Sequence, residues 1–364
     1  MAFNATIEDF QRLGLRHLTE THTTELQSSN RFTEARAYAN FERRFDRAGD
    51  TLARSDSDRA FHLVARATEI IDYRLPFVEE QKAKELIKEA KQLLTEASSL
   101  DPHCFDARRM LAASSCPSFD AYHRYLIDHA SEVKQVCEQN ARSVAFSENA
   151  SGKLARDLAM RPYLRWLAAE ATQALICGRY RCCIESSSRL IEADSEQISD
   201  AYRTLAFALV KLEDADALNK LIEASGKTIA SDPWLALASL AMSYKLHHLV
   251  QASEILSVIL ATWPHAAQAL SIQQDLPEGV FARPRLEPLS EDELVVAISE
   301  ASVLLQEGRD RDGRGALGSW VAHEPQVIQA LAQESDRAAF SMRSNPSDSA
   351  DAQSSSFDDN KDNR

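Results

Sequence analysis

The sequence predicts an all-α fold, an array of consecutive antiparallel helical hairpins that ends in a disordered tail. Apolar residues recur with the 3.6-residue period of an amphipathic helix from about residue 58 to residue 262. Good helix formers dominate these segments, and the 10 Gly and 11 Pro of the chain fall mostly between them. No alternating run of β-branched residues with hairpin turns occurs in the sequence, so β-strands are not expected.

The expected helices begin in an N-terminal extension, residues 1–57. It should hold a helix over 5–20 and a helical pattern over 35–45, with a polar stretch between them. Further along, Pro76 should occupy the first turn of a long helix, a position that proline tolerates. Short connections imply antiparallel neighbours, so residues 58–271 are predicted to form one repeat domain. Its helices are expected at 58–73, 76–99, 103–114, 118–146, 152–177, 180–193, 197–212, 214–225, 233–246 and 249–262.

Residues 272–340 differ in character from the repeats. Pro and Gly punctuate residues 275–288, which we expect to be an extended linker. Ser290 and Glu293 have the spacing of a capping box and predict the start of another helix. A glycine-rich loop, 308–318, should precede a last helix near 325–340. Residues 341–364 are polar with almost no apolar content, which predicts disorder.

A recurring spacing of residues marks the second helix of successive hairpins. A small residue lets two helices cross closely, a bulky residue follows four positions later, a third position comes three residues after that, and a helix breaker ends the unit. Cys183 and Ala252 hold the first position in two units and lie 69 residues apart, close to two repeats of roughly 34 residues. The pattern is that of a tetratricopeptide-like α-solenoid. The matching sets are Ala90, Leu94, Ala97 and Pro102; Cys183, Ser187, Leu190 and Ser195; and Ala252, Leu256, Ile259 and Pro264.

Residues 161–194 resemble a more specific family. The segment Arg161-Pro162-Tyr163-Leu164-Arg165 is similar to the Arg-Pro-Tyr-Met-Arg of bacterial relatives of the suppression-of-tumorigenicity proteins, and residues 83–112 are similar to their leading hairpin. The similarity covers roughly 80–225. The Asn-Pro-Asn-Asp usual in that family is replaced by Asp-Ser-Glu-Gln at 194–197. The resemblance implies helical repeats and a scaffold role, and it supplies no catalytic residues.

Charge and hydropathy restrict the expected partners. The net charge of −14 opposes long-range attraction to nucleic acid or anionic lipid. The N-terminus has no cationic region followed by an apolar core, so no signal peptide is expected. The longest nearly apolar stretch, 234–242, is much shorter than the roughly 20 residues that span a bilayer. We therefore expect a cytoplasmic protein with no membrane partner.

The side chains that could carry chemistry have simpler structural interpretations. Cys177, Cys182 and Cys183 lie on two helices around a turn, and no fourth ligand has zinc-site spacing, so we interpret them as packing thiols. His247 and His248 should lie at a hairpin turn. The glycine-rich residues 307–315 lack the Gly-Lys-Ser/Thr ending of a nucleotide-binding loop. We expect no catalytic residue, metal or cofactor, no small-molecule substrate, and no enzymatic activity.

A local excess of basic residues predicts the binding face. Residues 142–189 hold eight Lys or Arg and four Asp or Glu, a balance of +4. The sequence therefore predicts an interaction scaffold or adaptor that holds a protein or peptide, with an acidic segment as the fitting ligand. A regulatory protein contacting nucleic acid through the same face is the alternative. The predicted partner-binding residues are Arg161, Tyr163, Arg165, Arg179 and Arg181.

Overall fold

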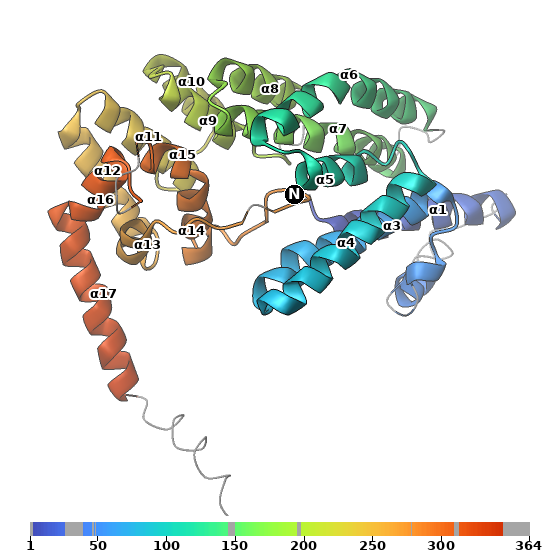
Figure 1. Ribbon diagram of the computed structural model, residues 1–364, viewed down its shortest axis with the longest axis horizontal. Helices are drawn as coiled ribbons and strands as arrows, with labels where there is room; N and C mark the ends of the chain where they lie inside the picture. Colours follow the sequence, from blue (N-terminus) through green and yellow to red (C-terminus); the bar gives the residue numbers. More distant parts are fainter. Residues whose placement is uncertain are drawn as a thin grey trace, which may run out of the picture. The chain divides into compact units, whose positions relative to one another are not determined.

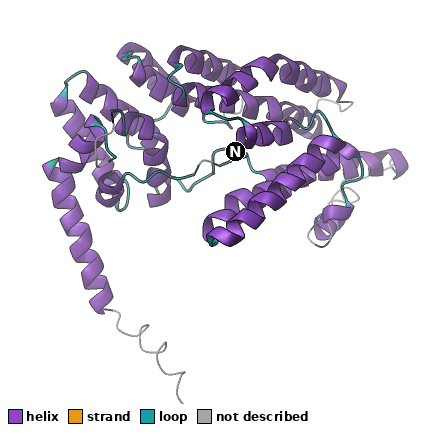
Figure 2. Ribbon diagram, in the orientation of Figure 1, coloured by secondary structure: helices purple, strands orange, loops and turns teal. Residues whose placement is uncertain are grey.

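The computed structural model describes residues 3–25, 39–45, 47, 49–144, 150–194, 198–277, 279–308 and 313–344. Within these ranges all regular structure is helical, as Figure 2 shows, so the predicted all-α class is confirmed. The predicted tail is corrected at its start, because residues 341–344 belong to the last helix. Its remainder, 345–364, lies outside the described residues, as do 26–38 near the N-terminus.

The chain forms two compact units. Unit 1 comprises Met1–Ser225 together with Pro277–Leu286, and unit 2 comprises Gly226–Leu276 and Glu287–Arg364. The boundary falls inside the range 58–271 that the sequence predicts to be one repeat domain. Residues 277–286 of the predicted linker belong to unit 1.

Unit 1 is a succession of helices in which chain neighbours pack together. The closest packing joins α3 to α4, α6 to α7, α7 to α8 and α8 to α9, and α1 packs on α3 and α7 (Figure 1). The helices are α1 (Ala5–Glu25), a short helical stretch at 39–45, α3 (Asp56–Thr68), α4 (Glu80–Leu100), α5 (Phe105–Ser115), α6 (Phe119–Ser143), α7 (Ala150–Ile176), α8 (Tyr180–Ala193), α9 (Ala201–Lys211) and α10 (Ala215–Ser225).

Unit 2 contains the α11–α12 hairpin, the longer helix α17 and several short helices. The α11–α12 hairpin packs on α13, α14 and α17. The sequence did not predict α13, and α16 begins inside the expected glycine-rich loop. Gly318 lies within α16. Only glycine fits at this position, because a Cβ would lie 2.5 Å from the carbonyl oxygen of Leu305. The helices are α11 (Pro233–Lys245), α12 (Leu249–Thr262), α13 (Ala266–Ile272), α14 (Glu291–Glu300), α15 (Ser302–Leu305), α16 (Ala316–His323) and α17 (Pro325–Ser344).

Polar side chains fix where several helices begin. The Ser55 hydroxyl accepts a hydrogen bond from the Asp58 N–H and starts α3, and the Asp232 carboxylate does the same for α11, with Pro233 in the first turn. Ser290 caps α14 as predicted. The predicted capping box is incomplete, because the Glu293 carboxylate does not accept from the N–H of Ser290. It accepts instead from the N–H of Leu289, one residue before the cap, at 2.8 Å.

The turn between α7 and α8 shows how a hairpin closes. Gly178 has a left-handed φ of 71°, which glycine adopts without steric cost. The Arg179 N–H then donates back to the Ala174 carbonyl at 2.8 Å, and α8 begins at Tyr180. The predicted helix 180–193 is confirmed at both ends, and so is the predicted helix 249–262.

The positions predicted to lie at helix crossings are buried. Among them, Cys183 and Ala252 are fully buried, whereas Cys182, one residue from Cys183, is exposed. A small residue at such a position allows close packing, so the predicted packing role is confirmed for these positions. The buried set is Ala90, Leu94 and Ala97; Cys183, Ser187 and Leu190; and Ala252, Leu256 and Ile259.

Pro76 does not start the long helix. It lies in a separate 3₁₀ turn, Leu75–Phe77, that follows a π-helical turn at Glu69–Arg74. Val78 and Glu79 are extended, with ψ near 156° and 158°, so α4 begins only at Glu80. No helix among the described residues is both long and apolar enough to cross a membrane.

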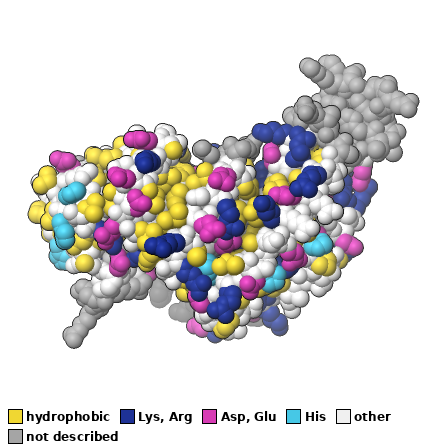
Figure 3. All heavy atoms as spheres, turned by 90° about the horizontal axis from the view of Figure 1, so that it is seen from above, with side chains coloured by type: hydrophobic (Ala, Val, Ile, Leu, Met, Phe, Trp, Pro, Cys, Tyr) yellow, Lys and Arg dark blue, Asp and Glu magenta, His cyan; other side chains and the backbone are white. Residues whose placement is uncertain are grey.

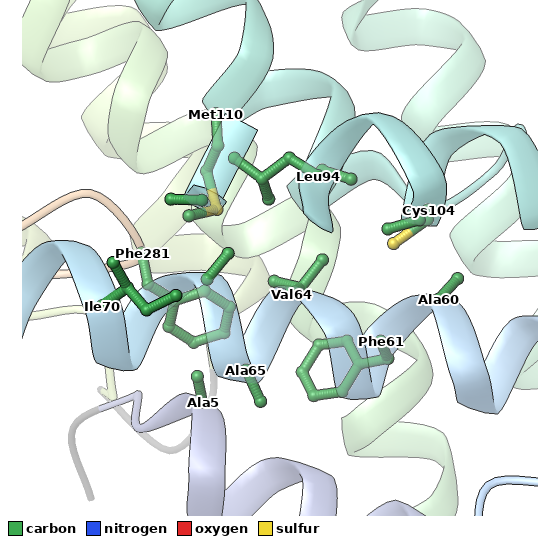
Figure 4. Close-up of a cluster of buried hydrophobic side chains, with 14 of the residues drawn as sticks. Ala5, Ala60, Phe61, Val64, Ala65, Ile70, Leu94, Cys104, Met110 and Phe281 are labelled. Carbon is green, nitrogen blue, oxygen red and sulfur yellow. The ribbon is translucent and has the colours of Figure 1, made fainter. Parts of the chain in front are cut away.

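Unit 1 has its main core where α3, α4 and α5 meet. Figure 4 shows Val64 of α3 directed toward Leu94 of α4, while Ala65 lies on the opposite side of α3, near Ala5 of α1. Met110 of α5 belongs to the same buried cluster. A second buried cluster lies between α6 and α7 and is centred on Trp166, whose indole N–H donates to the Leu126 carbonyl at 2.9 Å. The two clusters flank the polar site described next.

Candidate functional site

The structure divides the five predicted partner-binding residues into two groups. Arg161, Tyr163 and Arg165 are buried, with 8%, 5% and 2% of their surface exposed. Arg179 is half-buried at the start of α8, and Arg181 is exposed one residue into that helix. The expected common binding face is therefore corrected: three of its members lie inside unit 1, and only Arg179 and Arg181 lie at the surface.

Pro162 explains part of this arrangement. Helix α7 runs from Ala150 to Ile176, and Pro162 lies inside it. Proline has no N–H, so the carbonyl of Leu158, four residues earlier, lacks its helical donor. The Arg12 guanidinium of α1 donates to that carbonyl at 2.8 Å. The gap that Pro162 leaves in α7 thus receives a side chain of α1.

Arg165 is the centre of a buried ionic network. Its Nε and Nη2 donate to the two carboxylate oxygens of Asp106 on α5 at 2.8 and 2.6 Å. Its Nη1 and Nη2 donate to the two oxygens of Glu8 on α1 at 2.8 and 3.1 Å. The guanidinium also lies 4.2 Å from the ring centre of Phe281. Two bidentate pairs satisfy a buried guanidinium, which would otherwise be very costly to desolvate.

The electrostatics of the network are mutually reinforcing. Burial, the largest single influence, would raise the pKa of Glu8 and of Asp106, but Arg165 and the neighbouring arginines together hold both pKa values below their usual range. Burial alone would lower the pKa of Arg165, and the carboxylates of Asp106 and Glu8 raise it instead. Arg161 adds a bond to the Gln11 side chain at 2.9 Å. These pKa shifts keep Glu8, Asp106 and Arg165 charged at neutral pH.

Tyr163 points to the other side of α7. It belongs to the apolar cluster between α6 and α7, together with Cys137 of α6. Burial raises the pKa of its phenol. Tyr163 is thus a core residue, and the Arg161–Arg165 segment joins α7 to α1, α5 and α6 within unit 1.

A segment from the predicted linker completes the site. We call residues 279–283 the inserted segment. Arg109 of α5 donates to the carbonyl of Val280 at 3.1 Å and to that of Phe281 at 2.8 Å. Asp72, after α3, accepts from the N–H of Val280 at 3.0 Å. Burial raises the pKa of Asp72, although the N–H groups of Val280 and Phe281 oppose the shift.

Side chains anchor the same segment. Phe281 is buried in the core of unit 1, with its ring edge-on to Phe61 at 6.2 Å between centres, and Figure 4 shows it directed toward Ala65 and Ile70 of the first hairpin. Arg283 donates to the Asp200 carbonyl and to the Thr204 hydroxyl, both at 3.2 Å. The inserted segment is therefore held by its main chain and by two side chains.

Part of the basic excess of residues 142–189 is paired with acids that lie outside that range. Arg179 pairs with Asp120 of α6 at 2.7 Å and Arg142 with Glu138 at 2.9 Å. On the face seen in Figure 3, Lys and Arg side chains are mixed with Asp and Glu. Because the partner acids lie outside the counted range, the local sequence balance of +4 overstated the basic character of this surface.

The site residues that the sequence interpretation missed are Glu8, Asp72, Asp106, Arg109 and Phe281. One signal was available: Phe281 is a large apolar residue inside a Pro-rich stretch, where a solvated linker has no use for one. The described residues contain no group of three or more His, Cys, Asp or Glu side chains placed to hold a metal ion. No protein-family model, curated protein or solved structure matches this chain.

Proposed function

We propose that this chain is a helical-repeat adaptor of the tetratricopeptide type, acting in the cytoplasm, that binds peptide segments of protein partners. The observation that carries the proposal is the inserted segment. Unit 1 holds a non-helical stretch of polypeptide through main-chain bonds to Asp72 and Arg109 and a buried pocket for Phe281. These are the contacts with which a groove binds a peptide: main-chain bonds give affinity and a side-chain pocket gives specificity.

The repeat geometry supports the same function. Small residues predicted at helix crossings are buried in three hairpins, as a stack of such hairpins requires. Stacked hairpins present long surfaces lined by helices, and such surfaces serve in binding. The resemblance of residues 161–165 to the suppression-of-tumorigenicity family points to a scaffold role as well.

Arg179 and Arg181 remain the candidate contacts for an acidic segment of a partner. Arg181 is exposed, and Arg179 is held by a part-exposed pair with Asp120 that a stronger anion could displace. Contact with nucleic acid gains no support, because Arg161, Arg165 and Arg189 are engaged by acids within unit 1. Binding to DNA or RNA would need unpaired basic groups along one face.

Selection from a library of random twelve-residue peptides tests the proposal. The full chain is immobilised, and enriched peptides are measured by fluorescence anisotropy against the wild type and against Arg179→Ala with Arg181→Ala. We expect a shared motif among the selected peptides, with acidic ones losing at least tenfold in affinity for the double variant. Absence of any motif, or steeply salt-dependent binding to a labelled DNA duplex instead, would overturn the proposal.

A further inference from the structure

The inserted segment contacts unit 1 as a ligand contacts a receptor. Its main-chain acceptors and a main-chain donor are both bound, with Arg109 donating to two carbonyls and Asp72 accepting from an N–H. These bonds recognise a backbone and do not depend on which side chains the segment carries. A passive linker needs none of them, because water satisfies its backbone equally well.

Two side chains of the inserted segment supply selectivity. Phe281 fills an apolar pocket and lies against the Arg165 guanidinium, a cation–π arrangement that favours an aromatic ring over an aliphatic side chain. Arg283, two residues later, reaches the start of α9 through Asp200 and Thr204. Gly279 allows the bend at residues 280–282, since a Cβ at this glycine would lie 2.5 Å from the Ala282 carbonyl oxygen.

We propose that residues 279–283 are an internal ligand, and that the groove they occupy in unit 1 also accepts an external peptide with an aromatic residue followed two positions later by arginine. This inference rests on the proposed peptide-binding function and names a second class of ligand, distinct from the acidic segment expected at Arg179 and Arg181. An external peptide competes with a segment of the same chain, whose tether raises its effective concentration at the groove. The wild type is therefore self-occupied, and binding in trans requires displacement of the inserted segment.

The test uses the full chain and a fluorescently labelled peptide of residues 277–286. Binding is compared for the wild type, for Arg283→Ala, and for Phe281→Ala with Arg283→Ala, in which the internal ligand is weakened. We expect affinity for the labelled peptide to rise in that order, by about tenfold or more between the first and last proteins. A peptide carrying the same two alanines should bind none of them.

Matched variants of the groove locate the binding. In the Phe281→Ala/Arg283→Ala background, Asp72→Ala should lose the labelled peptide, whereas Asp72→Asn keeps an acceptor oxygen and should retain it. Circular dichroism and a thermal melt establish that each variant is folded, and Arg283→Ala alone gives the comparison if the double variant is not.

Two results would overturn the inference. One is equal, weak binding of the labelled peptide to every folded variant. The other is binding that Asp72→Ala does not reduce. If library peptides still bind the wild type in either case, the internal ligand is excluded while the adaptor function stands. Failure of both experiments excludes the function itself.

Discussion

At the residue scale, Arg165 is the side chain on which unit 1 depends most. It pairs with Glu8 and Asp106 in a buried environment, so removing it leaves two buried carboxylates without their main partner. Arg165→Ala should lower the free energy of unfolding by about 3–5 kcal/mol. Urea denaturation followed by circular dichroism measures the change. Exposed Arg181→Ala is the control and should stay within about 0.5 kcal/mol of the wild type.

His123 is expected to make unit 1 sensitive to mild acid. It is fully buried on α6, neither ring nitrogen has a hydrogen-bond partner among the described residues, and burial, with Arg179 nearby, lowers its pKa. Glu170 and Asp120 oppose the shift without reversing it. The unfolded chain then binds a proton that the folded chain does not, so stability is lost as the pH falls below about 6.5.

His123→Leu should therefore flatten the decline of the urea midpoint between pH 7 and pH 5. Glu8 and Asp106 act at lower pH: their lowered pKa values stabilise the fold above roughly pH 4.5, and that stability is lost on further acidification. They titrate equally in both proteins and serve as an internal reference. Parallel declines for wild type and variant between pH 7 and pH 5 would contradict the role of His123.

The contacts of individual side chains were harder to predict from the sequence than the positions of the helices. The sequence predicted Arg161 and Arg165 as contacts for an acidic segment of a partner, whereas the structure pairs both with acidic side chains of the same chain. The sequence could not indicate that the anions are Glu8 and Asp106, because these lie 157 and 59 residues from Arg165. Only the tertiary packing of α1 and α5 on α7 brings the charges together.

At the scale of the element, α1 docks on α7 at the backbone gap left by Pro162. In Pro162→Ala the restored N–H competes with Arg12 for the Leu158 carbonyl. Arg12→Ala should then lower the free energy of unfolding less in the Pro162→Ala background than in the wild type. A double-mutant cycle should give a coupling energy of about 1 kcal/mol. The pair between Arg12 and Glu8 is present in both backgrounds and cancels. Strict additivity would mean that the gap has no part in docking α1.

Helix crossings give a second prediction at this scale. Ala90 and Ala252 are buried at the centres of their hairpins. Ala90→Leu and Ala252→Leu should each destabilise the protein by about 1–3 kcal/mol, because the extra atoms have no space. Glu89→Leu, on the exposed side of α4, is the matched control and should have little effect. Melts of both alanine variants that overlay the wild type would contradict the proposed repeat spacing.

Long, strongly periodic helices were predicted from the sequence more reliably than the effects of proline and the short helices. Strong periodicity with a clear breaker located 180–193 and 249–262 correctly at both ends. Pro76 was misplaced, because the effect of a proline depends on neighbours that the local sequence does not reveal. The short helix α13 was missed because its seven residues are too few to show a period.

At the scale of the whole molecule, the division into two units predicts two unfolding transitions. Each unit has its own internal packing. In differential scanning calorimetry, Arg165→Ala should lower the transition of unit 1 alone, and Ala252→Leu that of unit 2 alone. Equal shifts of both transitions by either variant would contradict independent cooperative units. So would a single transition in the wild type and in both variants.

The path of the chain also sets a schedule for biosynthesis. The contacts of the inserted segment join residues 172 and 208 positions apart. The ribosome must therefore make all of residues 226–276 after Ser225 before Phe281 can enter its pocket, a delay of roughly 3–10 s at 5–20 residues per second. During that interval the nascent unit 1 presents an open apolar pocket. A chaperone or a neighbouring nascent chain can fill it first, so crowded polysomes should favour dimers that exchange this segment.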